Sequence, residues 1–220
     1  MRYKNYFDNI FCEIGLKNRF FIEAGANDGV SQSNTSYLES DGWRGLLIEP
    51  NIENFTRCRQ NRPNSYCINA ALISDSYTSS TVKGIFSSES LNRDNGLMSG
   101  CTDEHLNLYP NWVCEVPAIT LTDCLIQSNS PANPDFFSLD VEGFEIEALN
   151  GLDFNRFRPR VIFLEISKWF EIDYLNNQIE FLKNRGYEFH SNPGGFNPIL
   201  QSISENYSQE GNFTFIDKHN

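Results

Sequence analysis

The feature that most constrains the fold is a short apolar run followed at once by a turn with two glycines. The run is Phe20-Phe21-Ile22-Glu23-Ala24, and the turn is Gly25-Ala26-Asn27-Asp28-Gly29. The apolar run predicts a strand buried on both faces of a parallel sheet. Gly25 and Gly29 allow the chain to turn tightly and to bring bare backbone against a ligand. Residues 30–39 predict a helix, so strand, turn and helix form a ligand-binding unit at the carboxyl end of a strand.

The turn differs from the Gly-x-Gly-x-x-Gly sequence of dinucleotide sites, because its pattern is Glu-x-Gly-x-x-x-Gly. Glu23 lies at the end of the strand, and the turn carries Asn27 and Asp28. These groups suit a ligand with cationic and hydroxyl groups, such as S-adenosylmethionine, better than a pyrophosphate. Glycine-rich turns after strands also occur where only packing requires them, so the turn by itself leaves both interpretations open.

Strands and helices continue to alternate along the chain. After an N-terminal helix within residues 1–18, strands are predicted at residues 20–24, 45–49, 65–73, 81–86, 113–119, 136–140, 161–165, 187–190 and 213–216. Further helices are predicted at residues 51–60, 121–127, 142–150 and 169–184. Residues 87–111 are polar and irregular, which predicts either a lid that binds the acceptor or a decorative insertion. The alternation predicts one α/β domain over residues 1–220 with a mostly parallel sheet.

The acidic composition restricts the partners of the protein. The chain has 220 residues and a formal net charge of −12, so we expect it to repel nucleic acid and anionic membranes. No apolar run approaches the ~20 residues of a membrane span, and the N-terminus lacks the apolar core of a secretion signal. The six cysteines show no metal-type spacing. We therefore expect a soluble, cytoplasmic protein with reduced thiols.

Acids end four of the predicted strands, namely Glu23, Glu49, Asp140 and Glu165. The carboxyl ends of parallel strands share one edge of a sheet, where open α/β sheets bind their ligands. Glu49 follows Glu23 by 26 residues, near the ~20 at which an acid binds ribose hydroxyls after a glycine turn. Because a carboxylate accepts two hydroxyl hydrogen bonds at once, we favour a ribose-binding role of Glu49 over a structural one.

These motifs together resemble the FkbM family of S-adenosylmethionine-dependent methyltransferases. The resemblance rests on residues 21–30, on Leu47-Ile48-Glu49-Pro50-Asn51, on Asn69-Ala70-Ala71-Leu72 and on residues 136–145, and it extends from about residue 20 to residue 167. Ser138 stands where many members have a lysine. The resemblance implies a class I methyltransferase fold, which is Rossmann-like, with helices on both faces of a seven-stranded, mostly parallel sheet of order 3-2-1-4-5-7-6.

The resemblance also implies roles for individual residues. The turn of Gly25, Ala26, Asn27, Asp28 and Gly29 would surround the methionine part of the cofactor. Glu49 would bind the ribose, Asn69 and Ala70 would flank the adenine, and Asp140 would lie beside the sulfonium. Glu23 and Pro50 complete the predicted cofactor-binding set.

Methyl transfer to an oxygen also requires removal of the hydroxyl proton. The candidate bases are Asp140, Glu142 and His105. A neutral imidazole suits this task near pH 7, but a histidine in an irregular stretch is also expected to be exposed to solvent. Glu142 is also placed to face the N-terminus of its own helix. Asp140 and Glu165 offer oxygen ligands for Mg²⁺ or Mn²⁺.

We therefore expect an O-methyltransferase that acts on a hydroxyl of a sugar, a glycan or a small hydroxylated metabolite. Aromatic residues could stack on a sugar ring or belong to the core; they are Tyr109, Trp112, Trp169 and Phe170. One alternative is a nicotinamide-dependent oxidoreductase, which the missing Gly-x-Gly-x-x-Gly disfavours. Another is a non-catalytic binding module that keeps the fold. The sequence predicts no oligomeric state.

Overall fold

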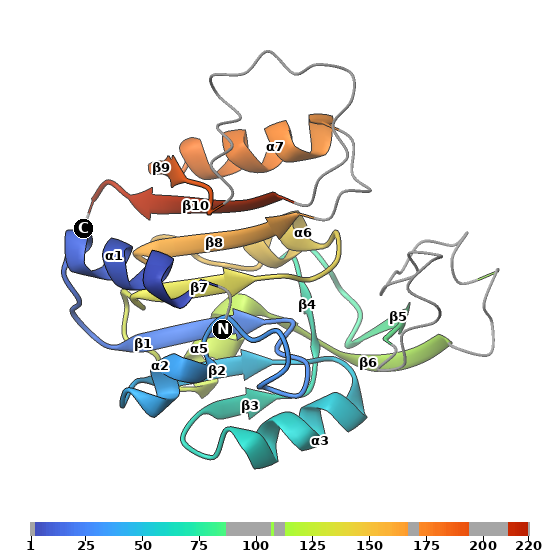
Figure 1. The fold of residues 1–220 in the computed structure, drawn as a ribbon. Coiled ribbons are helices and arrows are strands. Elements are labelled where there is room, and N and C mark those ends of the chain that lie inside the picture. The colour runs from blue at the N-terminus through green and yellow to red at the C-terminus, as the bar shows by residue number, and fades with distance from the viewer. Residues whose placement is uncertain (1–2, 87–106, 108–112, 167–171, 194–210, 220) are drawn as a thin grey trace.

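A seven-stranded sheet forms the centre of the protein. The computed structural model describes residues 3–86, 107, 113–166, 172–193 and 211–219. The strand order is β3-β2-β1-β7-β8-β10-β9 (Figure 1). These strands are β1 (Phe20–Ala24), β2 (Arg44–Ile48), β3 (Tyr66–Ile68), β7 (Phe136–Leu139), β8 (Val161–Ile166), β9 (Tyr187–Ser191) and β10 (Gly211–Asp217). Neighbours are parallel except β10, which is antiparallel to β8 and β9. Numbered along the chain, the strands have the predicted order 3-2-1-4-5-7-6, which is confirmed.

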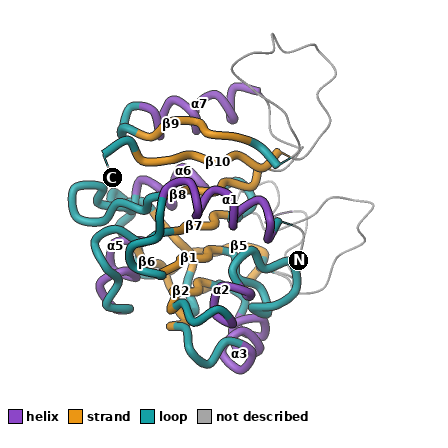
Figure 2. The backbone as a smooth tube through the Cα atoms, turned by 60° about the vertical axis from the view of Figure 1, so that its left-hand side comes forward, coloured by secondary structure: helices purple, strands orange, loops and turns teal. Residues whose placement is uncertain are grey.

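Helices cover both faces of this sheet (Figures 1 and 2). One face carries α1 (Lys4–Ile14), α2 (Ser36–Ser40) and α3 (Ile52–Asn61), and the other carries α5 (Leu121–Gln127), α6 (Glu145–Asn150) and α7 (Ile172–Lys183). A smaller sheet has the order β4-β6-β5, formed by β4 (Ala71–Ile73), β5 (Thr81–Ile85) and β6 (Val113–Thr120). No helix within the described ranges is long and apolar enough to cross a membrane.

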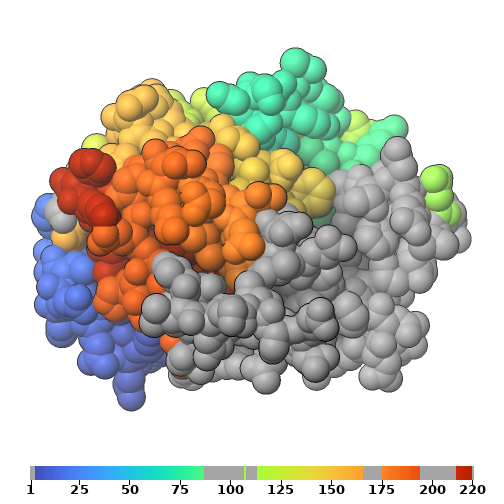
Figure 3. Space-filling model, turned by 90° about the horizontal axis from the view of Figure 1, so that it is seen from above, coloured from blue at the N-terminus to red at the C-terminus, as the bar shows by residue number. Residues whose placement is uncertain are grey.

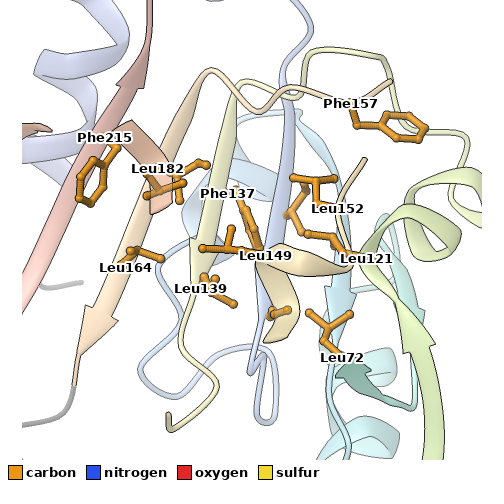
Figure 4. Packing of buried hydrophobic residues seen from close by; sticks show 14 of the residues in the cluster. Leu72, Leu121, Phe137, Leu139, Leu149, Leu152, Phe157, Leu164, Leu182 and Phe215 are labelled. Carbon is orange, nitrogen blue, oxygen red and sulfur yellow. The ribbon is translucent and has the colours of Figure 1, made fainter. Parts of the chain in front are cut away.

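Two apolar clusters, one on each face of the sheet, form the core. Because successive side chains of a strand point to opposite faces, Phe20 and Ile22 of β1 join the cluster beneath α5, α6 and α7, whereas Phe21 joins the cluster beneath α1. Figure 4 shows part of the first cluster, with Leu139 and Leu164 of the sheet close to Leu149 of α6. In the space-filling view from above, both the segment of α7 and β9 (orange) and the chain around β5 (teal) reach the surface (Figure 3).

The predicted strand at residues 65–73 is wrong as a single element, because the structure divides it between two sheets. β3 pairs in parallel with β2 in the main sheet, whereas β4 pairs in parallel with β6 in the smaller one. The break falls at Asn69, whose side-chain amide donates hydrogen bonds to the carbonyls of Glu49 and Pro50. Both strands are partly buried, so the apolar pattern of the sequence continues from β3 into β4 and does not mark the break.

Two predicted helices begin later than expected. The helix at residues 30–39 is reduced to α2, because the N–H groups of Val30 and Ser31 bond to the Asp28 carboxylate in a turn. The helix at residues 142–150 begins at Glu145, because Glu142 and Gly143 adopt positive φ angles of 53° and 99°. By contrast, α3 starts where predicted, and the Asn51 side chain caps it by accepting from two backbone N–H groups.

Asp135, directly before β7, connects the start of β1 to the rest of the sheet. Its side chain is fully buried and accepts hydrogen bonds from the N–H groups of Asn18 at 2.7 Å and Arg19 at 2.6 Å. It also pairs with the buried Arg160 guanidinium, Nη1 to Oδ1 at 3.0 Å. A buried ion pair supports a fold only when both partners stay in place.

We predict that Asp135→Asn lowers the free energy of unfolding by about 3–5 kcal/mol, because the Arg160 charge stays buried without its partner. Chemical denaturation measures this difference. The exposed Asp75 provides the control, since Asp75→Asn is expected to stay within about 0.5 kcal/mol of the wild type. A loss below about 1 kcal/mol for Asp135→Asn would contradict the assigned role.

Candidate active site

The acids that end four predicted strands lie at one edge of the main sheet. β1 pairs in parallel with β2 and with β7, and β7 pairs in parallel with β8. Glu23 and Glu165 lie near the ends of β1 and β8, and Glu49 and Asp140 follow directly after β2 and β7. The edge formed by the carboxyl ends of these strands is where open α/β sheets bind ligands.

Gly25 brings the turn after β1 against the backbone of Asp140. Its φ angle is +80°, and a Cβ atom at this position would lie 1.8 Å from the Asp140 carbonyl oxygen. Real Cβ contacts are never this short, so the close approach requires glycine. The requirement comes from the protein's own backbone, and it places the glycine turn directly beside Asp140.

The end of β2 holds the other side of the same turn. The N–H groups of Gly25 and Ala26 both donate to the Ile48 carbonyl, at 3.0 and 3.1 Å. The N–H of Asn27, a residue with φ +50°, donates to Glu49 Oε2 at 2.8 Å. The turn therefore touches Asp140 on one side and Glu49 on the other, and these predicted cofactor groups are neighbours in space.

Glu49 is buried, and its carboxylate is fixed by two backbone N–H groups. Oε2 accepts from Asn27, and Oε1 accepts from Asn51 at 2.9 Å. Burial raises the pKa of Glu49 to about 6, although these two hydrogen bonds act to lower it. Asn69 Nδ2 donates to the carbonyls of Glu49 and Pro50, both at 2.8 Å, and so fixes the backbone that presents the acid. Ala70, next to Asn69, is buried.

Glu23 is engaged by the protein itself. The residue is 4% exposed, and its carboxylate accepts hydrogen bonds from Ser33 Oγ at 2.8 Å, Thr35 Oγ1 at 2.6 Å and the Asn34 N–H at 2.8 Å. Burial raises the pKa of Glu23, while the Thr35 hydroxyl and the Arg62 charge act in the opposite direction. In this structure Glu23 anchors the segment that follows the glycine turn.

Arg62, directly after α3, is a site-supporting residue that the sequence patterns did not indicate. Its guanidinium is buried and donates from Nε to Glu39 Oε2 at 2.6 Å and from Nη1 to the Gly29 carbonyl at 2.9 Å. Nη1 also lies 3.7 Å from Glu23 Oε2. In the sequence, Arg62 follows a predicted helix and precedes a proline, which is typical of an ordinary cation at a helix end.

Asp140 lies among other acids. Burial raises its pKa well above the ordinary value, and the charges of Glu165, Glu142, Glu145 and Glu23 raise it further, in that order. Its N–H donates to the Ala24 carbonyl at 3.1 Å, which fixes the start of the turn after β7. A carboxylate with a raised pKa is a stronger base once it is ionised, and a cation beside it favours the ionised form.

The remaining predicted groups are the metal ligands Asp140 and Glu165, the candidate base His105 and four aromatic residues. Leu139 of β7 pairs with Leu164 of β8, so the next residues along the two strands, Asp140 and Glu165, lie next to each other at the edge of the sheet. Among the described residues, however, no group of three or more His, Cys, Asp or Glu is arranged to hold a metal ion. His105 lies outside the described residues, as do the side chains of Tyr109, Trp112, Trp169 and Phe170.

Comparisons with known structures identify the class of fold. Magnesium protoporphyrin IX methyltransferase from Synechocystis PCC 6803, solved with bound S-adenosylhomocysteine (SAH), has 8% identity and a TM-score of 0.50, and the match covers 97% of this chain and 80% of that one. A TehB-like S-adenosylmethionine-dependent methyltransferase from Corynebacterium glutamicum has 11% identity and a TM-score of 0.48, with 96% and 86% covered. The fold is that of the class I S-adenosylmethionine-dependent methyltransferases.

Sequence comparison identifies the family. Residues 23–189 match the methyltransferase FkbM domain, so the chain belongs to the FkbM methyltransferase family, as the resemblance predicted. A comparison with curated protein sequences gives no match. Family and fold together define a methyltransferase that depends on S-adenosylmethionine.

We predict that Gly25→Ala is far more damaging than Gly42→Ala. Gly42 has a similar φ of +85° but no atom within 4 Å of an added Cβ, so its substitution carries only the left-handed backbone cost of about 1–2 kcal/mol. At Gly25, the Asp140 backbone must also move. Denaturant unfolding and calorimetric titration with S-adenosylmethionine measure both effects, and equal losses in the two variants would contradict the close approach.

We predict that Glu49 makes stability depend on pH. Its pKa of about 6 exceeds the ordinary 4.5, so the folded state binds the proton more tightly than the unfolded state. Its contribution to stability therefore falls as the pH rises from about 4.5 to about 6, by about 2 kcal/mol in total. Glu49→Gln lacks this titration. Urea unfolding of both proteins across the interval measures the difference, and parallel curves would contradict the raised pKa.

Proposed function

We propose that the protein transfers a methyl group from S-adenosylmethionine to a hydroxyl of a sugar, a glycan or a small hydroxylated metabolite. The observation that supports this most directly is the arrangement of Gly25, Glu49 and Asp140 around one edge of the sheet. These residues come from three different strand ends, and a single turn touches both acids. The family and the fold identify the chain as a methyltransferase, and the residues of the candidate site suggest how it binds the cofactor.

The chemistry of the site residues fits this cofactor. When bound, S-adenosylmethionine supplies an electrophilic methyl group on a positively charged sulfur. The acids around Asp140 favour a cation, and the Glu49 carboxylate can accept hydrogen bonds from the two ribose hydroxyls. The glycine turn, held beside both acids, provides a backbone surface for the methionine part. None of these groups requires a phosphate-containing ligand, such as a dinucleotide, as its partner.

Asp140 is the proposed base that removes the proton of the acceptor hydroxyl. Its pKa is raised by burial and by neighbouring acids, so the carboxylate holds a proton more strongly than an ordinary aspartate does. Glu142, in the turn after β7, is the second candidate, and His105 is the third. In-line transfer to an oxygen leaves positioning and proton removal as the main tasks of the protein.

The acidic surroundings of Asp140 also bear on the acceptor. The charges that act most strongly on it are all acids, and the whole chain carries −12. A hydroxyl compound without phosphate or carboxylate groups is therefore the proposed substrate, and nucleic acid is not. A sugar or a glycan with neutral hydroxyls fits this description, as does a small hydroxylated metabolite.

Calorimetry and turnover assays test this function. The wild-type protein is titrated with S-adenosylmethionine and with NADH, and then assayed with a panel of neutral sugars, glycans and alcohols. Binding of S-adenosylmethionine and conversion to SAH with a neutral hydroxyl acceptor is the expected result. Binding of NADH alone would favour an oxidoreductase. Cofactor binding without turnover across the panel would favour a non-catalytic binding module.

The same turnover assay tests the proposed divalent cation at Asp140 and Glu165. The reaction is repeated after treatment with EDTA and after addition of Mg²⁺ or Mn²⁺. A rate that EDTA abolishes and the metal restores supports the site, because a metal ion that orients oxygen groups is required for every turnover. An undiminished rate in EDTA would exclude it.

We predict that Asp140→Asn lowers turnover by about 100-fold or more, the usual range for loss of a general base. Folding is expected to be unharmed, because asparagine keeps the size of the side chain and burial together with the neighbouring acids raises the pKa of Asp140, so its charge is not a source of stability. Initial rates at saturating S-adenosylmethionine and denaturant unfolding measure the two properties. Glu142→Gln serves as the comparison, and near-normal turnover of Asp140→Asn would remove it as the base.

A further inference from the structure

The end of α3 binds the last residues of the glycine turn, whereas the end of β2 binds the first ones. Asn61 Nδ2 donates to the Asp28 carbonyl at 2.9 Å, and Arg62 Nη1 donates to the Gly29 carbonyl at 2.9 Å. Two consecutive side chains thus hold two consecutive carbonyls of the turn. We call Asn61 and Arg62 the α3 clamp. Neither residue is among those predicted to bind the cofactor.

Arg62 is itself fixed in one position. Its three nitrogens make five hydrogen bonds, to Glu39, the Gly29 carbonyl, Ser33 and two oxygens of Thr35. Glu39 is held in turn, because it accepts from the Asn64 N–H at 2.9 Å and from Ser65 Oγ at 2.6 Å. A guanidinium with all its donors engaged has no other low-energy orientation.

The turn also packs directly on the stem of Arg62. A Cβ atom on Gly29 would lie 2.7 Å from Arg62 Cγ and 3.0 Å from Cys58 Sγ. Gly29 therefore has no room to move toward α3, and its carbonyl cannot turn away without losing the Arg62 hydrogen bond. The α3 clamp thus restricts both the position and the orientation of the turn.

These contacts leave the turn held at both ends. Its first residues bond to Ile48 and Glu49, and its last residues bond to the α3 clamp. A loop that already has its bound conformation gives up less conformational freedom when a ligand arrives. We propose that Asn61 and Arg62 are positioning residues for S-adenosylmethionine, which hold the turn in the shape that receives the cofactor. This inference rests on the proposed function of the turn.

Asn61→Ala is the decisive variant, because Asn61 is exposed and its loss leaves no buried charge. Asn64→Ala is the matched control: Asn64 is also exposed and lies just beyond α3, but among the described residues its side chain makes no bond to the turn. We expect the Kd of S-adenosylmethionine to rise about fivefold in Asn61→Ala, the size of one net hydrogen bond. We expect no change in Asn64→Ala, and partial recovery in Asn61→Gln, which keeps the amide donor.

Calorimetry with S-adenosylmethionine and denaturant unfolding are measured for each variant, together with Arg62→Lys. The lysine keeps the charge beside Glu23 and Glu39 but cannot reproduce the five hydrogen bonds, so its affinity is expected to fall more than that of Asn61→Ala. If Arg62→Lys does not fold, Asn61→Ala decides the question alone. Hydrogen exchange of the amides in the turn provides a direct readout, with faster exchange expected in Asn61→Ala than in Asn64→Ala.

Equal affinities of Asn61→Ala and Asn64→Ala would overturn the α3 clamp. So would a lower affinity of Asn61→Ala with unchanged hydrogen exchange of the turn amides, since the loss would then not come from a less ordered turn. Failure of the wild-type protein to bind S-adenosylmethionine is a separate outcome, which overturns the proposed function and the clamp with it.

Discussion

The contact between Gly25 and the Asp140 carbonyl is the constraint on which the site depends. β1 is a central strand, so the chain that leaves it must pass between the ends of β2 and β7. The passage is narrow enough that only a residue without a Cβ fits. Because the turn is forced into this space, Asp140 and Glu49 lie on either side of it although they are far apart in the sequence. Close packing of three strand ends therefore creates the site before any ligand is bound.

The acids at this edge of the sheet have different surroundings, and their proposed roles differ accordingly. Burial raises the pKa of Glu23, Glu49 and Asp140 alike. At Glu23 a buried arginine and three hydrogen-bond donors act against this effect, and at Glu49 two backbone N–H groups do so. At Asp140 the strongest charges are other acids, which add to the effect of burial. The acid paired within the protein supports the turn, whereas the acid surrounded by like charges is suited to take up a proton.

The sequence predicted the parts of the structure that follow from apolar pattern and local capping. The buried runs gave the strands, and Asn51 marked the start of α3. The division of residues 65–73 was not predictable, because an apolar pattern does not record which strand is the neighbour. The late starts of α2 and α6 depend on side-chain bonds to backbone and on positive φ angles. The proposed roles of Asn61 and Arg62 were not predictable from the sequence either, because their hydrogen-bond partners lie in a distant segment of the chain.

The buried charges around Arg62 lower the stability of the fold through their desolvation, and they keep the turn in place. A guanidinium between Glu23 and Glu39 must be removed from water, and such groups are often less stabilising than apolar residues of the same size. Their benefit is directional, because five hydrogen bonds from one rigid group fix the Gly29 carbonyl and the segment that follows it. An apolar side chain in this space would pack as well but would leave the turn free to change shape. In the proposed site, the glycine turn and the acids at the strand ends therefore carry the chemistry, and residues outside this set, such as Arg62, determine where those groups lie.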